Sequence, residues 1–256
     1  MHLTERDFDL LRYLMEQGVA TARQLTQRFF PTKGAFHKRI CALVKEQLVE
    51  SVPVTAMKEC SQASYFRTSI DLLGTGRSNM AKHRVYRLGE RYKKKWPSTA
   101  KLSAVHMWRH QLLVNELRFV FEKAFPDGQF LNDPQVLEEW RLWEHWKSGD
   151  CSDVPVPDLT IRSGDRHIAV EVERNLKTET NYFSRFMRYE SSQYTHVIYY
   201  CESEKVFKTV SKLAKNYEWM ACARFGTVHE VFRIMSGWTK LDAFLSEFQW
   251  KKKREL

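Results

Sequence analysis

The chain has 256 residues, of which 43% are hydrophobic, and its 41 Lys and Arg residues against 31 Asp and Glu residues give a formal net charge of +10. This length supports one good core and a smaller second one, so two domains are expected, and the charge favours a polyanionic partner such as nucleic acid or an anionic membrane surface. No apolar run approaches the roughly 20 residues of a membrane span, and five scattered cysteines exclude a disulfide framework and a zinc finger. A soluble, intracellular protein is expected.

Three short helices are predicted in the first fifty residues. Thr4 with Asp7, and Thr21 with Gln24, have the spacing of capping boxes, which predicts that a helix begins at each position. The first helix is expected to end at Gly18. Its expected apolar stripe consists of Phe8, Leu11 and Leu14 or Met15.

A third helix is predicted over about residues 32–46, and two extended segments follow at 48–54 and 83–90. This order of elements is typical of a winged helix, so residues 1–92 are expected to form a DNA-binding domain, with a basic linker over 93–101. The outer face of the third helix is basic and is the expected DNA contact. Its candidate residues are His37, Lys38, Arg39 and Lys45.

The second domain is expected over 102–256, with a basic tail. Its pattern begins with a long helix from Ser103 and continues as a mixed sheet with helices on its faces, an α+β or α/β arrangement. The expected strands lie at about 129–145, 156–162, 167–174, 196–201 and 227–234, and the expected helices at 179–192 and 203–219.

The pair Gly164-Asp165 has the form of a two-residue hairpin loop. In the register that this loop sets, paired residue numbers sum to 329, so the apolar residues of both strands fall on one side. Asp158 then faces Glu171 on the other side, with Glu173 diagonal to Asp158, at spacings of roughly 4.5–8 Å between Cβ atoms. The hairpin therefore gathers three carboxylates on one face.

Three like charges at such spacing repel, so a compensating ion is expected. An oxygen-only cluster fits Mg²⁺ or Mn²⁺, which can polarise a phosphate and activate a water molecule. The alternative is an amphipathic hairpin with one wet face. Two further candidates stay open: Glu116 adds an outer contact to the cluster or has a surface or capping role, and Tyr199 and Tyr200 are either nucleophiles or, the preferred reading, core residues.

The pattern Pro157-Asp158 followed by Glu171-Val172-Glu173 resembles the motif of the PD-(D/E)XK nuclease superfamily. The segments "LTERDFDLLRYL", "LTQRFF", "VYRLGE" and "HQLLVNELRFVF" add a resemblance to the replication-relaxation proteins of plasmids, in particular the MOBC class of mobilization relaxases, over most of residues 3–200.

The resemblance implies an N-terminal winged helix followed by a PD-(D/E)XK restriction-endonuclease-like domain. It also implies that Asp158, Glu171 and Glu173 bind Mg²⁺ or Mn²⁺ as catalytic residues. Glu173 stands where the usual motif has a lysine. Either Lys177 reaches back to supply that lysine, or a second metal replaces it.

The function implied is metal-dependent nicking of a plasmid origin of transfer, in double-stranded or locally melted DNA. Implied partners are an accessory mobilization protein and a type IV coupling protein, with no membrane insertion. Two alternatives stand beside this hypothesis. One is a non-catalytic DNA-binding regulator or relaxosome accessory protein that uses a nuclease-like scaffold, and the other is a restriction-like nuclease that cuts both strands.

Overall fold

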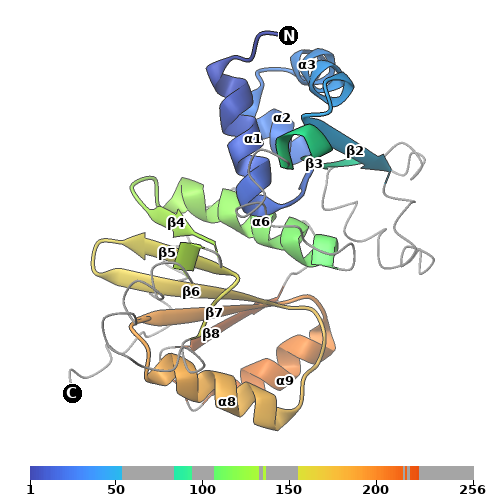
Figure 1. Ribbon diagram of the computed structural model, residues 1–256. Helices are drawn as coiled ribbons and strands as arrows, with labels where there is room; N and C mark the ends of the chain where they lie inside the picture. The colour runs from blue at the N-terminus through green and yellow to red at the C-terminus, as the bar shows by residue number, and fades with distance from the viewer. Residues whose placement is uncertain are drawn as a thin grey trace. The chain divides into compact units, whose positions relative to one another are not determined.

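The computed structural model describes residues 1–53, 84–93, 107–132, 135–136, 155–215, 217 and 220–224 (Figure 1). The chain divides into two compact units, Met1–Glu116 and Leu117–Leu256. Helices and two β-sheets make up the described part, which confirms the α+β class. Of the expected linker over 93–101, only Lys93 lies among the described residues, so the expected domain boundaries stay a prediction.

The first unit combines helices with a small antiparallel sheet in the order β1-β3-β2. Its elements are α1 (Glu5–Gln17), β1 (Ala20–Thr21), α2 (Ala22–Phe29), α3 (Lys33–Lys45), β2 (Val49–Pro53), β3 (Arg84–Leu88) and α5 (Glu90–Lys93). The helix α6 (Trp108–Ala124) follows, and the division between the units falls within it.

The helix starts in this unit are fixed locally, as the sequence predicts. Thr4 donates its backbone N–H to the Asp7 carboxylate at 2.7 Å, and Gln24 donates its backbone N–H to the Thr21 hydroxyl at 3.2 Å. Both capping boxes are therefore confirmed. Gly18, with φ of 73°, ends α1 and donates its N–H to the carbonyl of Leu14.

The expected stripe on α1 is wrong at Phe8, whose surface is 46% exposed. The buried side of α1 instead carries Leu10, Leu11 and Leu14, together with Asp7 one turn earlier. Asp7 turns inward because it is a hydrogen-bonding group of the capping box, and that orientation leaves Phe8 outside the core.

The second unit contains a five-stranded mixed sheet in the order β4-β5-β6-β7-β8. The first three strands pair antiparallel, and the last three pair parallel. Its elements are β4 (Gln129–Leu131), β5 (Leu159–Ser163), β6 (Arg166–Glu173), α8 (Glu179–Glu190), β7 (His196–Cys201), α9 (Glu204–Ala214) and β8 (Met220–Arg224).

The hairpin register of β5 and β6 is confirmed. Leu159 pairs with Val170 and Ile161 with Ile168, and Gly164 has φ of 59° in the turn. β8 has no counterpart in the sequence prediction, whereas the expected strand at 227–234 and most of the expected strand at 129–145 lie outside the described residues.

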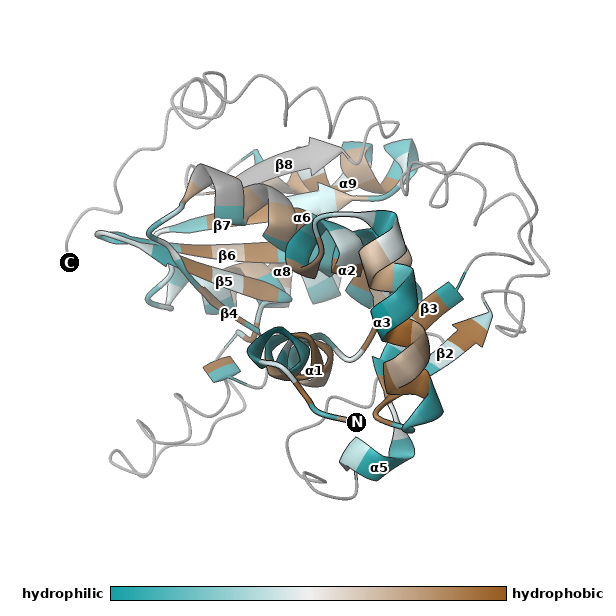
Figure 2. Cartoon of the chain, turned by 90° about the horizontal axis from the view of Figure 1, so that it is seen from above, coloured by the Kyte–Doolittle hydropathy of each residue, from teal (hydrophilic) through white to brown (hydrophobic). Residues whose placement is uncertain are grey.

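Both faces of this sheet are covered. Helices α8 and α9 pack on one face, where Ala169 and Tyr199 share a core with Phe186 and Val210. On the opposite face, Phe121 of α6 meets Tyr200 at 6.1 Å between ring centroids. Figure 2 accordingly shows brown, hydrophobic stretches on β5 and β6.

Tyr199 and Tyr200 are 0% and 5% exposed, so the preferred core reading is confirmed. Among the described residues, no helix combines the length and the apolar character that a membrane crossing requires.

Candidate functional site

Two acidic residues lie inside the second unit, on its central strand. Glu171 and Glu173 belong to the face of β6 that α8 covers, and they are only 3% and 4% exposed. The alternative of an amphipathic hairpin with one solvent-exposed face is therefore wrong. A carboxylate removed from water in this way needs charged or hydrogen-bonding partners, because its desolvation is costly.

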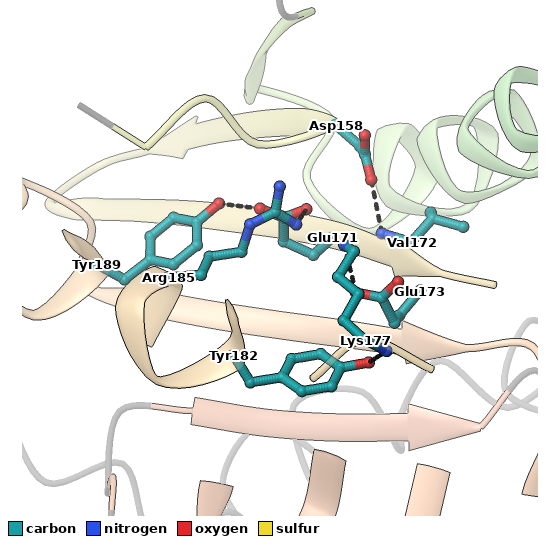
Figure 3. A network of polar contacts seen from close by, with 8 residues as sticks. All are labelled: Asp158, Glu171, Val172, Glu173, Lys177, Tyr182, Arg185 and Tyr189. Carbon is teal, nitrogen blue, oxygen red and sulfur yellow. Dashed lines mark hydrogen bonds and ion pairs between the residues drawn. The ribbon is translucent and has the colours of Figure 1, made fainter. Parts of the chain in front are cut away.

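Glu171 has both of its oxygens bonded by residues of α8 (Figure 3). Tyr189 donates its hydroxyl to one oxygen, and Arg185 donates a guanidinium N–H to the other at 3.0 Å. Arg185 and Tyr189 are four residues apart and so lie on one side of the helix. The same side of α8 therefore supplies a cation and a hydroxyl to one buried carboxylate.

Burial raises the pKa of Glu171 to about 7. The charge of Arg185 and the hydroxyl of Tyr189 oppose this rise, while the negative charge of Asp158 adds to it. In return, the negative charge of Glu171 raises the pKa of Arg185 above its ordinary value. Glu171 and Arg185 thus each shift the pKa of the other, and Asp158 acts electrostatically on the same carboxyl.

Glu173 is paired with Lys177, whose ammonium group lies 2.8 Å from Glu173 Oε2 (Figure 3). Lys177 belongs to the short connection between β6 and α8, and its backbone N–H donates to the Tyr182 hydroxyl at 3.3 Å. The next residue, Thr178, caps α8. The connection therefore folds back toward the end of β6 and brings Lys177 to Glu173, while the role of Lys177 as the motif lysine stays a prediction.

Asp158 is the residue directly before β5. Continuing the register of β5 and β6 by one residue pair places Asp158 opposite Glu171. Its Oδ2 accepts a hydrogen bond from the backbone N–H of Val172 at 2.7 Å (Figure 3). Asp158 thereby satisfies a backbone donor of β6 at the point where the paired part of β5 has ended. This contact holds the carboxyl beside the central strand.

The donor chemistry of these three acids suits Mg²⁺ or Mn²⁺, but in this structure each acid is already engaged by a protein group. In the part of the chain that the structure describes, no group of three or more His, Cys, Asp or Glu residues is placed to hold a metal ion. Glu171 and Glu173 instead bind protein cations, and Asp158 binds a backbone amide.

A third acid–base pair lies at the same end of the sheet. Arg174 follows β6 and donates its Nε–H to Glu202, which follows β7, at 3.2 Å. Sequence reasoning missed Arg174, Arg185 and Tyr189. The available signal was the Arg185–Tyr189 spacing on a helix that faces two buried acids.

The basic candidates of the first unit separate into two kinds. His37, Lys38 and Lys45 are exposed on α3. Arg39 is instead bound to Asp7, with 2.8 Å between its Nε and Asp7 Oδ1. Arg39 therefore joins α3 to α1, while the other three candidates keep their charges or rings in solvent.

Glu116 has neither a surface nor a capping role, because its side chain is only 14% exposed and its pKa is raised by burial. Gln24 donates to its carboxylate at 2.7 Å, and Arg23 forms an ion pair with it. These contacts lie within the first unit. The hydrogen bond from Gln24 and the ion pair with Arg23 stabilise the buried carboxylate of Glu116 without a metal.

The fold and the site define an α+β protein in which buried acids and surface-reaching cations are paired at the end of a central strand. The model of the replication-relaxation family matches residues 11–210, so the chain belongs to the replication-relaxation family, and the resemblance noted in the sequence is confirmed. Comparison with curated proteins and with solved structures finds no match. The family indicates a role in plasmid replication or mobilization, and the involvement of DNA.

Proposed function

We propose that the chain is a relaxase that nicks one DNA strand at a plasmid origin of transfer. The observation that carries this proposal is the concentration of Asp158, Glu171 and Glu173 at one end of β6, with two of the carboxylates buried. Buried charges are costly and are common at functional sites. Family membership and the net charge of +10 support a DNA substrate.

The proposed role of the first unit is to place the protein on its DNA site. The order of α1, α2, α3, β2 and β3 supports a winged-helix arrangement. His37, Lys38 and Lys45 lie exposed on α3, where they would contact phosphates and base edges. An accessory mobilization protein and a type IV coupling protein are the further partners in this proposal.

The proposed cofactor is Mg²⁺ or Mn²⁺, held by Asp158, Glu171 and Glu173. Because Arg185 and Lys177 already bind the two glutamates, a metal would have to displace both cations. The metal is proposed to bind in the second unit and DNA to contact α3 of the first unit. The metal requirement therefore needs a test separate from that of DNA binding.

A second function is favoured by the same ion pairs. In the described part of the chain, Glu171 and Glu173 are neutralised by protein cations, as in a stable core and unlike an open metal site. This arrangement supports a non-catalytic DNA-binding regulator or relaxosome accessory protein built on a nuclease-like scaffold.

The deciding experiment follows conversion of a supercoiled plasmid carrying the cognate origin to open circles in the presence of Mn²⁺ or Mg²⁺. We expect Asp158→Asn to abolish nicking, because it removes the charge while an amide oxygen can still accept the hydrogen bond from Val172. The matched control is Asp165→Asn, at an exposed residue of the hairpin turn, which should nick like the parent.

Each result points to one reading. Nicking by Asp158→Asn at the parental rate would remove Asp158 from the catalytic site. Specific plasmid binding without metal-dependent nicking by the parent would support the regulator, and a linear product would support a nuclease that cuts both strands.

A further inference from the structure

Three basic residues surround the carboxyl end of β6, and each is bound by one acid. Arg174 is paired with Glu202, Lys177 with Glu173, and Arg185 with Glu171. We refer to Arg174, Lys177 and Arg185 as the anchored cations.

In each pair the acid is more deeply buried than its cation. The side chains of Glu202, Glu173 and Glu171 are 14%, 5% and 4% exposed. The corresponding cations are 24%, 39% and 37% exposed. A ligand that approaches these three pairs therefore meets the cations first, because the acids of the pairs lie deeper.

The anchored cations keep unused hydrogen-bond donors. The bond from Arg185 to Glu171 uses one of the five N–H groups of a guanidinium, and the bond from Lys177 to Glu173 uses one of three in an ammonium. Among the described residues, the structure gives neither side chain a second hydrogen-bond partner. The remaining donors suit an oxyanion that offers several oxygens.

The buried acids also hold these cations in place. A long basic side chain loses rotamer freedom when it binds a ligand, and prior anchoring by a carboxylate reduces that loss. The location is favourable as well, since β6 and β7 are parallel and ligands of such sheets bind beyond the carboxyl ends of the strands. In the metal-free protein, Glu171 and Glu173 then hold the cations Arg185 and Lys177 in place.

We propose that the anchored cations form a metal-independent binding site for the phosphate groups of single-stranded DNA. DNA as the source of the phosphate rests on the proposed function, whereas the oxyanion site rests on the ion pairs. Arg185 and Lys177 are the principal contacts, and Arg174 has the smaller exposed surface.

The test measures binding of a fluorescent single-stranded 12-mer by anisotropy, with EDTA present and over a range of salt concentrations. Arg185→Gln is expected to weaken binding about tenfold, because a charge-assisted hydrogen bond is lost. The slope of log affinity against log salt should fall by about 0.7, the value for one phosphate contact on a single strand.

The matched control is Arg188→Gln, which removes the same charge from an exposed position on the same helix. It should change affinity less than twofold. Lys177→Gln should act in the same direction as Arg185→Gln. Lys177→Gln leaves the ion pair between Arg185 and Glu171 intact. It therefore keeps the test decisive if circular dichroism shows that Arg185→Gln does not fold.

Parental affinity in folded Arg185→Gln and Lys177→Gln would overturn the site. An equal loss in Arg188→Gln would also overturn it, because the effect would then be one of general charge. Inorganic phosphate serves as a competitor: displacement as effective as that by unlabelled 12-mer at equal phosphate concentration would overturn DNA as the ligand. The assay involves neither metal nor cleavage, so its outcome is separate from that of the nicking experiment.

Discussion

At the scale of single residues, Asp7 is a fully buried carboxylate that links two helices. It accepts hydrogen bonds from Thr4 at the start of α1 and from Arg39 of α3. Burial alone would raise the pKa of Asp7, but the hydrogen bonds from Arg39 and Thr4 outweigh it and lower the pKa to about 2. The ionised form is therefore the one that the folded state stabilises.

This shift predicts a pH-dependent stability. A pKa of about 2 in the folded state, against 3.8 for the unperturbed group, corresponds to about 2 kcal/mol of folding free energy. The contribution is fully present above pH 3.8 and is lost as the pH falls toward 2. Asp7→Asn should therefore lower the free energy of unfolding by about 2 kcal/mol at pH 7, in urea titrations, with a shrinking difference below pH 3.8.

Asp9→Asn is the matched control, since the Asp9 side chain is 50% exposed and pairs only with the exposed Arg12 among the described residues. Its effect should stay within about 0.5 kcal/mol. A difference between Asp7→Asn and the parent that persists unchanged to pH 2 would contradict the ionic origin of the stabilisation.

The acids of the candidate site and the nearby Lys177 could be found in the sequence, but the partners of Glu171 on α8 could not. The two-residue loop at Gly164-Asp165 fixes the register of its strands, and the register places Asp158 near Glu171. Arg185 comes 14 residues after Glu171, so their contact depends on how α8 lies on the sheet. That packing is tertiary information which a local pattern does not contain.

At the scale of elements, two glycines are required for different reasons. Gly164 has φ of 59°, and a Cβ added there would meet no atom within 4 Å. Gly89 joins β3 to α5, and a Cβ there would lie 2.1 Å from the backbone oxygen of Gln47. The first position is limited by backbone conformation, and the second by space.

Alanine at each position should separate these causes. Gly164→Ala should lower the free energy of unfolding by about 1 kcal/mol, and Gly164→Asn by less, because Asn tolerates the left-handed region. Gly89→Ala should lower it by at least about 3 kcal/mol, because the backbone of Gln47 must move. Denaturant titrations give these values, and equal losses for the two alanine variants would contradict the distinction.

Elements with local signals could be predicted, and elements without them could not. The capping boxes at Thr4 and Thr21 are complete within four residues, so both helix starts are correct. The strand β1 has only two residues and is defined by its pairing with β3, so no alternation of apolar and polar residues predicts it. The error at Phe8 has a similar origin, because the inward turn of Asp7 depends partly on Arg39 of another helix.

At the scale of the whole molecule, the net charge of +10 and the family point to DNA, and the exposed face of α3 is the proposed contact. Lys38→Gln with Lys45→Gln should weaken binding of duplex origin DNA. The slope of log affinity against log salt should fall by about 1.8, which corresponds to two phosphate contacts. Melting temperature should not change, because both side chains are exposed.

The control carries Lys205→Gln and Lys208→Gln on α9, where both residues are exposed and the charge change is equal. It should bind duplex DNA like the parent. An equal loss of affinity and slope in the control would show that net charge governs binding and that α3 has no special role.

The parallel register of β6 and β7 sets Cys201 beside Glu173, and the Cys201 side chain is completely buried. Cys41, in contrast, is an exposed free cysteine on α3. The two thiols therefore differ in chemical accessibility: an alkylating reagent can reach Cys41 in the folded protein, but it reaches Cys201 only when the core between the sheet and the helices α8 and α9 opens. The rate at which Cys201 is alkylated, followed by peptide mass spectrometry, is thus a native measure of how often the core beside the buried acids opens to solvent.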